Sequence, residues 1–354
     1  MHEIITGLVF EIYYPFIAAI GVPANVAVIV ILSRNRCCLS GCVIYYLVSM
    51  AVADLLVIIT AVILNRIAGM YFPISFLSIT PLCSFRSAFN YAALASSAWL
   101  TVSFTLDRFI VISCQKLNVK YCSEKMAGRV IIIVFVLSCV KNTFTYFYYE
   151  PMYLENNVPW FCALKPIFYT SPAWTAYDWI RSILTPCLPF ILILLLNVLT
   201  VRHILVANQA RRRLRNLNTR GNQKDLEIEK RRKSIVLLFA ISGSFILLNL
   251  LCFLTIPYVR VAGVTYPSGS DQSTFIFILQ ESGYMLQLLS SCINPFIYAG
   301  TQLKCNNVNS NLKTSFTIVK YYSCAFSKPP TLQLLGAYFN HMEILELYEF
   351  NNPS

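Results

Sequence analysis

Long stretches without a charged side chain recur along this sequence and limit how it can fold. Five of them cover residues 12–33, 87–106, 182–201, 234–259 and 282–303. Two more contain one ionisable residue each, Asp54 in 37–65 and Lys141 in 130–149. Each stretch provides the roughly 20 mostly apolar residues that a helix needs to cross a bilayer. We therefore predict an all-α membrane protein built as a seven-transmembrane helix bundle.

The composition and the positions of the charges support this class. The chain is 57% hydrophobic and only 12% charged, which is too apolar for one soluble core. Its net charge of +12 would also suit a nucleic-acid partner, but the basic residues gather in alternate connections between the stretches. They are Arg34 and Arg36, Lys116 to Arg129, Arg211 to Arg215, and Lys230 to Lys233. This distribution is typical of the cytoplasmic side of a membrane protein, where basic residues contact lipid headgroups, so no nucleic-acid partner is predicted.

The same rule gives the orientation, with the N-terminus outside and the C-terminus in the cytoplasm. We divide the chain into a short extracellular N-terminus (1–10), a transmembrane domain (11–303) and a cytoplasmic tail (304–354). Of the thirteen cysteines, only Cys83 and Cys162 fall on the predicted outer side. Two thiols in an oxidising compartment are expected to form a disulfide.

An acid and an arginine lie side by side at the end of the uncharged stretch 87–106. Asp107, Arg108 and Phe109 follow it directly. Placing either charge at membrane depth costs at least about 2.5–3.5 kcal/mol, so such residues are usually retained for function. The pair is our first candidate for a functional site.

Asp54 is a carboxylate inside the second stretch, and for the same reason it is expected to face the interior of the bundle. Asn25 in the first stretch also needs a polar partner within the membrane. One interpretation is a hydrogen-bonded packing contact between Asp54 and Asn25. The other is a site for a small cation, because Ser97, Ser291 and Asn294 would add the oxygen ligands that small hard cations prefer.

The last stretch contains the sequence Asn294-Pro295-Phe296-Ile297-Tyr298. A proline inside a helix removes one backbone hydrogen bond and kinks the helix. This segment is therefore predicted to be an element that can rearrange.

Taken in order, these motifs resemble a known family of membrane proteins. They are Gly21-X-X-X-Asn25, Ala53-Asp54-Leu55-Leu56, Cys83, Asp107-Arg108-Phe109, Pro189 and Asn294-Pro295-X-X-Tyr298. Their ordered occurrence across seven helices resembles a rhodopsin-like (class A) G-protein-coupled receptor over roughly residues 10 to 303. Stretches such as CQKLNVKYCSEK, EPMYLENNVPWFC and FILQESGYMLQLLSSC further resemble the group of G-protein-coupled receptor 139.

The resemblance implies roles for these residues. Arg108 would pair with Asp107 at rest and face a heterotrimeric G protein when the helices separate, with Phe109 in place of the usual tyrosine. Tyr298 would swing inward on activation, and Pro295 would belong to the same movable element. The implied sodium pocket consists of Asp54, Asn25, Ser97 and Asn294. The implied location is the plasma membrane.

The sequence departs from the family in its sixth helix. Counting from Phe245, the position of the family's tryptophan is Asn249; counting from Pro257, it is Thr255. In either register the tryptophan is missing. We expect Asn249 to form a hydrogen bond between helices. The fourth helix also carries Lys141, and these departures are the grounds for the alternative of a receptor-like chain that no longer signals.

The predicted outer half of the bundle collects residues that could bind a ligand. They are Arg86, Asn90, Tyr91, Arg181, Phe253, Glu281 and Tyr284. Asn90 occupies the position where amine receptors have an acid, so an amine ligand is not expected. A guanidinium such as that of Arg181 recognises carboxylates, and aromatic walls suit an apolar body. This predicts a small zwitterion or a short peptide with an aromatic group, although Arg181 could instead pair internally with Asp178 or Glu281.

The sequence bears on four possible functions. A transporter is disfavoured because no inverted repeat and no pair of interrupted helices is visible in the sequence. A membrane enzyme is disfavoured because the histidines His2, His203 and His341 are scattered and no nucleophile lies near a base. A G-protein-coupled receptor for a small molecule or short peptide is the reading we adopt. A non-signalling chain and a transporter remain as alternatives.

Overall fold

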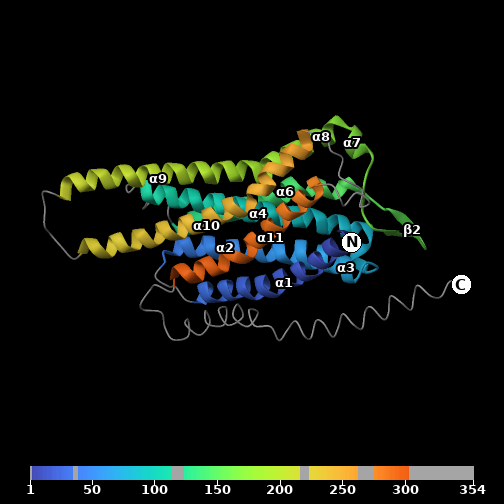
Figure 1. Cartoon of the computed structure of the whole chain (residues 1–354), viewed down its shortest axis with the longest axis horizontal. Helices are drawn as coiled ribbons and strands as arrows, with labels where there is room; N and C mark the ends of the chain where they lie inside the picture. The colour runs from blue at the N-terminus through green and yellow to red at the C-terminus, as the bar shows by residue number, and fades with distance from the viewer. Residues whose placement is uncertain (1, 35–38, 114–122, 216–222, 262–274, 303–354) are drawn as a thin grey trace. The chain divides into compact units, whose positions relative to one another are not determined.

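The computed structural model describes residues 2–34, 39–113, 123–215, 223–261 and 275–302, and the long helices run alongside one another (Figure 1). The seven long helical segments are α1 (His2–Arg34); α2 (Gly41–Val57) with η1 (Ile58–Ile67) and α3 (Ala68–Tyr71); α4 (Thr80–Ser113); α6 (Glu124–Thr143) with η3 (Phe144–Tyr148); α8 (Pro172–Ser182) with η4 (Ile183–Cys187) and α9 (Leu188–Arg215); α10 (Gln223–Val261); and α11 (Phe275–Gln302). Two short helices, η2 (Phe76–Ser78) and α7 (Ile167–Thr170), lie in connections. The predicted tail at 304–354 lies outside the described residues.

Five segments among the described residues are long and apolar enough to cross a membrane. They are Val9–Arg34, Gly41–Tyr71, Glu124–Tyr148, Pro172–Ala207 and Ser234–Tyr258. Helices α4 and α11 are also long, at 34 and 28 residues, and their buried faces carry many serine, threonine and asparagine side chains. These features confirm an all-α membrane helical bundle. The predicted N-terminal segment 1–10 is helical from His2 onward.

The segment that continues α8 into α9 is not a regular helix. The chain leaves the helical conformation at Thr185, which has φ −158° and ψ 109°. Pro186 follows it, and a proline disfavours the α conformation of the preceding residue. The uncharged stretch 182–201 is therefore not the single regular helix that its length predicts.

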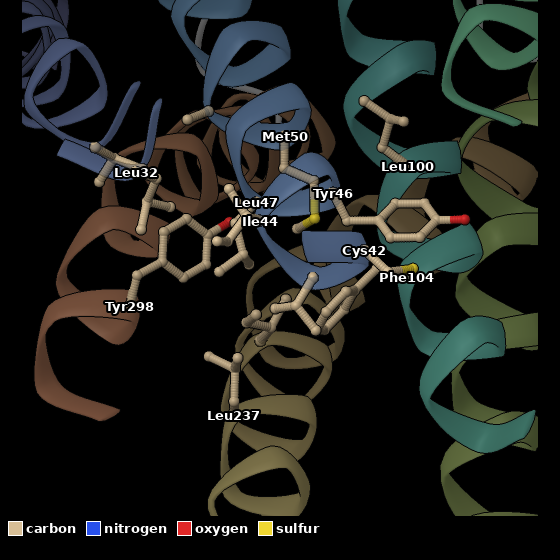
Figure 2. Close-up of a cluster of buried hydrophobic side chains, with 14 of the residues drawn as sticks. Leu32, Cys42, Ile44, Tyr46, Leu47, Met50, Leu100, Phe104, Leu237 and Tyr298 are labelled. Atoms are coloured by element: carbon tan, nitrogen blue, oxygen red, sulfur yellow. The ribbon is translucent and has the colours of Figure 1, made fainter. Parts of the chain in front are cut away.

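Two of the apolar clusters in the described part of the bundle are separated by a polar layer. The Tyr298 cluster includes Leu32, Leu47, Met50, Phe104, Leu237 and Tyr298 (Figure 2). The Tyr14 cluster includes Tyr14, Ile17, Val57, Ile58, Ala93, Leu288 and Cys292. Along each of α1, α2, α4 and α11, polar side chains fall between the residues of the two clusters. This polar layer consists of Asn25, Asp54, Ser97, Ser291 and Asn294.

A glycine allows α1 to approach its neighbours next to the polar layer. A Cβ atom on Gly21 would lie 2.5 Å from Ile58 Cδ1 and 2.6 Å from Cys292 Sγ. The missing side chain therefore lets α1 lie against both η1 and α11. This close approach also brings Asn25, one turn further along α1, to the backbone of α11.

Short strands form the connection between η3 and α7. Strand β2 (Tyr153–Glu155) pairs with β3 (Val158–Trp160), and β1 (Tyr149–Glu150) pairs with β4 (Ala163–Leu164), both antiparallel. The β2–β3 turn is formed by Asn156 and Asn157, whose φ values of 51° and 61° suit asparagine.

The predicted disulfide between Cys83 and Cys162 is present and joins this hairpin to α4. Two hydrogen bonds reinforce the junction: Phe161 N donates to Ser78 O at 2.7 Å, and Thr80 Oγ1 donates to Phe161 O at 2.7 Å. We call this the disulfide end of the bundle. The hairpin is thus held at several points over one end of α4.

We expect Cys162→Ser to lower the thermal unfolding midpoint of the purified chain and to reduce its delivery to the cell surface. A disulfide that closes a long loop typically contributes about 2–5 kcal/mol. Cys139→Ser is the matched control, because Cys139 is an exposed free thiol on α6. Unfolding midpoints that are equal in the two variants would show that the disulfide does not stabilise the fold.

Candidate functional site

Asp107 and Arg108 lie at the end of α4 that is opposite the disulfide, and both side chains are buried. Arg108 Nε donates to Asp107 Oδ2 at 3.0 Å, and Arg108 Nη2 bonds the same oxygen. The other carboxylate oxygen, Asp107 Oδ1, accepts a bond from Cys42 Sγ at 3.4 Å. Arg108 Nη1 reaches Ser234 Oγ of α10 at 3.5 Å. The arginine is therefore restrained by its neighbouring acid and also contacts α10, while Phe109 is only half-buried.

Tyr298 lies in the apolar cluster near this end. Its side chain is 1% exposed, and its hydroxyl has no hydrogen-bond partner among the described residues. Figure 2 shows the hydroxyl directed toward Leu47 and Ile44. A buried hydroxyl without a partner costs about 1–3 kcal/mol. Tyr298 follows Pro295 by one helical turn, so a helical segment that contains a proline carries a side chain that would gain by moving to a polar partner.

The polar layer centres on Asp54, whose side chain is fully buried. Ser97 Oγ donates to Asp54 Oδ1 at 2.6 Å, and Asn294 Nδ2 donates to Oδ2 at 2.8 Å. Ser291 lies close to the carboxylate as well. Side chains from α2, α4 and α11 therefore meet at one carboxylate.

Asn25 does not bond directly to Asp54, so the predicted packing contact is wrong in that form. Its Nδ2 donates to Gly21 O at 2.9 Å and to Ser291 O at 3.0 Å. Asn25 is instead bonded to the backbone of Ser291, whose side chain lies close to the carboxylate. Asn25 Oδ1 is buried and has no partner among the described residues. This oxygen, the carboxylate and the two serine hydroxyls form a donor set that suits a sodium ion.

The described residues contain no group of three or more histidine, cysteine, aspartate or glutamate side chains that could bind a metal. A transition-metal centre therefore has no support in the described part of the chain. The polar layer differs from such a centre because it offers one carboxylate with neutral oxygens.

Arg181 forms an ion pair on its own helical segment. Its Nη2 lies 2.9 Å from Asp178 Oδ1, three residues earlier, and its guanidinium lies 4.4 Å from the centre of the Tyr91 ring. Of the two internal partners considered from the sequence, Asp178 is confirmed and Glu281 is not. Arg181 Nε is buried without a partner among the described residues, so one donor of the guanidinium remains unused.

Glu281 pairs with a residue that our sequence reasoning gave no role. Arg66 Nη2 donates to both oxygens of Glu281, at 3.0 and 2.9 Å. The guanidinium lies 5.4 Å from the Tyr14 ring and 5.2 Å from the Tyr284 ring. This arrangement joins η1 to α11 and α1. No local motif could have revealed it, because Arg66 and Glu281 are 215 residues apart.

We expect Arg66→Gln and Glu281→Gln each to lower the thermal unfolding midpoint of the chain, and the double variant to lower it little further. The two side chains are 32% and 19% exposed, so solvent weakens the pair and we expect a coupling of about 1 kcal/mol. The measurement is a double-mutant cycle on the detergent-purified chain. Fully additive losses would indicate that the two residues do not stabilise each other.

The other predicted ligand residues also lie near the disulfide end, where Tyr284 lies close to Asn90, Tyr91 and Glu281, while Arg86 and Phe253 make separate contacts. Asn90 is buried and accepts from Thr60 Oγ1 at 3.4 Å, while Arg86 Nη1 donates to Leu64 O at 2.7 Å. Phe253 stacks on Phe190 with 4.3 Å between ring centres.

Tyr149 lies in β1, outside the helices. Burial raises the pKa of Tyr149 well above its usual range, and nearby Tyr91 adds to this shift. Its phenol therefore stays protonated.

Asn249 is one of the two candidate positions of the missing tryptophan, and the bond it makes differs from our prediction. It is 2% exposed, and its Nδ2 donates to Phe245 O at 3.0 Å, within α10 itself. The side-chain amide of Asn249 therefore donates within its own helix and not to a neighbouring helix, as we had expected. Phe245 packs with Ala98, Val102 and Ile193 of the neighbouring helices.

Comparisons with known proteins were made for the whole chain. Residues 24–298 match the family described as 7 transmembrane receptor (rhodopsin family). The C5a anaphylatoxin chemotactic receptor 1 of Oncorhynchus mykiss is 25% identical over 309 residues, which are 86% of this chain and 81% of that receptor. The matched range extends from just before Asn25 to Tyr298 and thus contains the polar layer and the Asp107–Arg108 pair.

Proposed function

Because this chain belongs to the rhodopsin family of seven-transmembrane receptors, we propose that it converts the binding of an extracellular small molecule or short peptide into activation of a heterotrimeric G protein. The bundle would cross the plasma membrane seven times, with α4 and α11 as the two crossings that are less apolar. The N-terminus would lie outside and the C-terminus in the cytoplasm, as the basic connections indicate. Family membership also removes the support for a transporter.

The observation that carries this proposal is the position of Arg108. It is buried, paired with Asp107 on its own helix and in contact with Ser234 of α10. Moving α10 away would break the Ser234 contact and open the arginine to a partner. A G-protein helix that binds in the resulting groove would prefer this open state. Ligand and G protein would then stabilise the same state and strengthen each other's binding.

Sodium is the proposed allosteric ion. Asp54, Ser97, Ser291, Asn294 and Asn25 would hold it, and the unpartnered Asn25 Oδ1 supports this assignment. A bound cation would neutralise a carboxylate that is otherwise surrounded only by neutral donors. It would favour the arrangement in which α2, α4 and α11 meet, which we assign to the resting receptor.

For the ligand we propose an aromatic compound with a carboxylate, such as an aromatic amino acid or a short peptide. Tyr91, Tyr284 and Phe253 offer aromatic surface, and Arg181 retains an unused donor. The group of G-protein-coupled receptor 139 remains our proposed place within the family. The Oncorhynchus mykiss relative is by its name a C5a receptor, and an identity of 25% does not transfer that ligand to this chain.

The test compares calcium and cAMP signals in cells that express the native chain or Arg108→Ala, both checked for surface delivery. Cells are measured without addition and with aromatic amino acids and short peptides. A basal or evoked response that requires Arg108 supports the proposal. A well-delivered native chain that is silent in both readouts favours the second candidate, a receptor-shaped chain without signalling. Asn249 at the tryptophan position is the observation behind that candidate, and Asn249→Trp would test it directly.

A further inference from the structure

Lys141 is a charged residue inside an apolar helical segment, Glu124–Tyr148. Its Nζ donates to Thr185 Oγ1 at 2.7 Å. Among the described residues, no carboxylate lies within ion-pair distance of this ammonium. Charged side chains in such segments usually face the bundle interior and pair with an acid, because an unpaired charge at membrane depth is costly. A neutral hydroxyl compensates this charge only in part.

A second positive charge lies near Lys141. Arg181 is close enough for the two charges to repel each other. Asp178 Oδ1 accepts a bond from Arg181 Nη2 at 2.9 Å, so this acid pairs with Arg181 and not with Lys141. Arg181 Nε is buried without a partner among the described residues. The group formed by Lys141, Arg181 and Asp178 carries a net positive charge.

The backbone at this place is irregular as well. Thr185, which accepts the bond from Lys141, is the residue that leaves the helical conformation. Irregular backbone at membrane depth is tolerated where it is buried in protein or faces a polar site. Trp99 Nε1 donates to Leu184 O at 3.1 Å and so satisfies one exposed carbonyl of the break. A helix break and an uncompensated ammonium therefore occur together between α6 and η4.

Aromatic side chains cluster beside the backbone of Lys141. Tyr177 OH donates to Lys141 O at 2.7 Å, which fixes the ring next to the lysine backbone. The Tyr177 ring lies 5.9 Å from that of Phe144, 5.6 Å from that of Tyr148 and 6.2 Å from that of Trp174. Rings of this kind suit an aromatic or apolar body attached to an anionic group.

We propose that Lys141 binds the carboxylate of an aromatic acid, with Thr185 orienting the ammonium and Arg181 Nε as a second donor. The added negative charge would neutralise the group, and charge-assisted hydrogen bonds to an ammonium and a guanidinium are among the strongest in proteins. This deepens the proposed function, on which it rests for the existence of a ligand, by assigning the acidic group of that ligand to α6. Lys141 as a mere stabiliser of the helix break is the competing role.

The test measures binding without any G protein. The full-length chain is purified in detergent, and its thermal unfolding midpoint is recorded with phenylacetate or indole-3-acetate and with the matching neutral amides, at constant ionic strength. We expect the acids to raise the midpoint and the amides to have little effect. Lys141→Met should weaken the apparent affinity for the acids about tenfold or more, and Lys141→Arg should retain part of it. Lys125→Met is the matched control on the exposed part of α6.

Two outcomes overturn the proposal. In the first, the acids and the amides change the unfolding midpoint of the native chain equally, or neither changes it. This comparison uses the native chain alone, so it does not depend on the folding of a variant. The second is a Lys141→Met chain that unfolds earlier but still distinguishes acids from amides, which would assign Lys141 to the helix break alone. Neither outcome affects the Arg108 signalling test, and a silent receptor that binds acids through Lys141 would refute the proposed signalling while leaving this site in place.

Discussion

Asp107→Asn is expected to raise basal G-protein activation strongly. The substitution keeps the size of the side chain but removes the charge that holds Arg108. Breaking one partner of a buried ion pair typically costs about 3–5 kcal/mol. In the proposed open state Arg108 leaves Asp107, so the population of that state should rise by roughly tenfold or more. The measurement is ligand-free nucleotide exchange on a G protein in membranes that contain equal amounts of receptor.

Two controls accompany this prediction. Asp107→Asn combined with Arg108→Ala should be inactive, because in the proposed mechanism the released arginine acts on the G protein. Cys42→Ala should raise basal activity less, since it removes the thiol at Asp107 Oδ1 but leaves the ion pair at Oδ2. Basal activity that stays at the native level in a well-delivered Asp107→Asn receptor would mean that this ion pair does not restrain the switch.

Asp54→Asn is expected to abolish the effect of sodium on signalling. In the native receptor, replacing sodium by N-methylglucamine should raise basal activation, because the resting arrangement loses its cation. The asparagine can still bond Ser97 and Asn294 but no longer offers a negative charge. A buried charged ligand supplies most of the attraction for a small cation, so affinity should fall by at least about tenfold.

Ser97→Ala is the graded control, because it removes one neutral oxygen and should weaken the sodium effect without abolishing it. Surface delivery is checked for both variants. An Asp54→Asn receptor with a native response to sodium would exclude the polar layer as its binding site. The packing contact alone would then explain why these residues lie together.

The polar layer could be anticipated because burial forces a carboxylate to find partners. Asp54, Ser97 and Asn294 were expected together from their places in apolar stretches, and the structure brings them into direct contact. The position of Asn25 was not predictable, since it bonds to the backbone carbonyl of Ser291. A sequence shows which side chains are polar, but it does not show which carbonyl will lie within reach.

The charged residues near the disulfide end show a second limit. Arg181 and Asp178 are three residues apart, which places both side chains on one helix face. The sequence therefore predicted Asp178 as one of two internal partners of Arg181. The Arg66–Glu281 pair depends on how η1 and α11 pack, and nothing local predicts it. The helix break at Thr185 could not be predicted from hydropathy. The hydropathy of an apolar stretch is the same whether the helix is regular or broken next to a proline.

The hydrogen bonds made by the side chains of α10 determine how much free energy a movement of this helix would cost. Ser242, Asn249 and Thr255 each donate to the backbone carbonyl four residues earlier on the same helix. A displacement of α10 as a rigid body leaves all of these bonds unbroken. Only attachments to other helices, such as Ser242 to Asn197 Oδ1 at 2.9 Å and Arg108 to Ser234, would have to be exchanged. At about 1 kcal/mol net for each hydrogen bond, this polar resistance is small enough for the binding of one modest ligand to overcome.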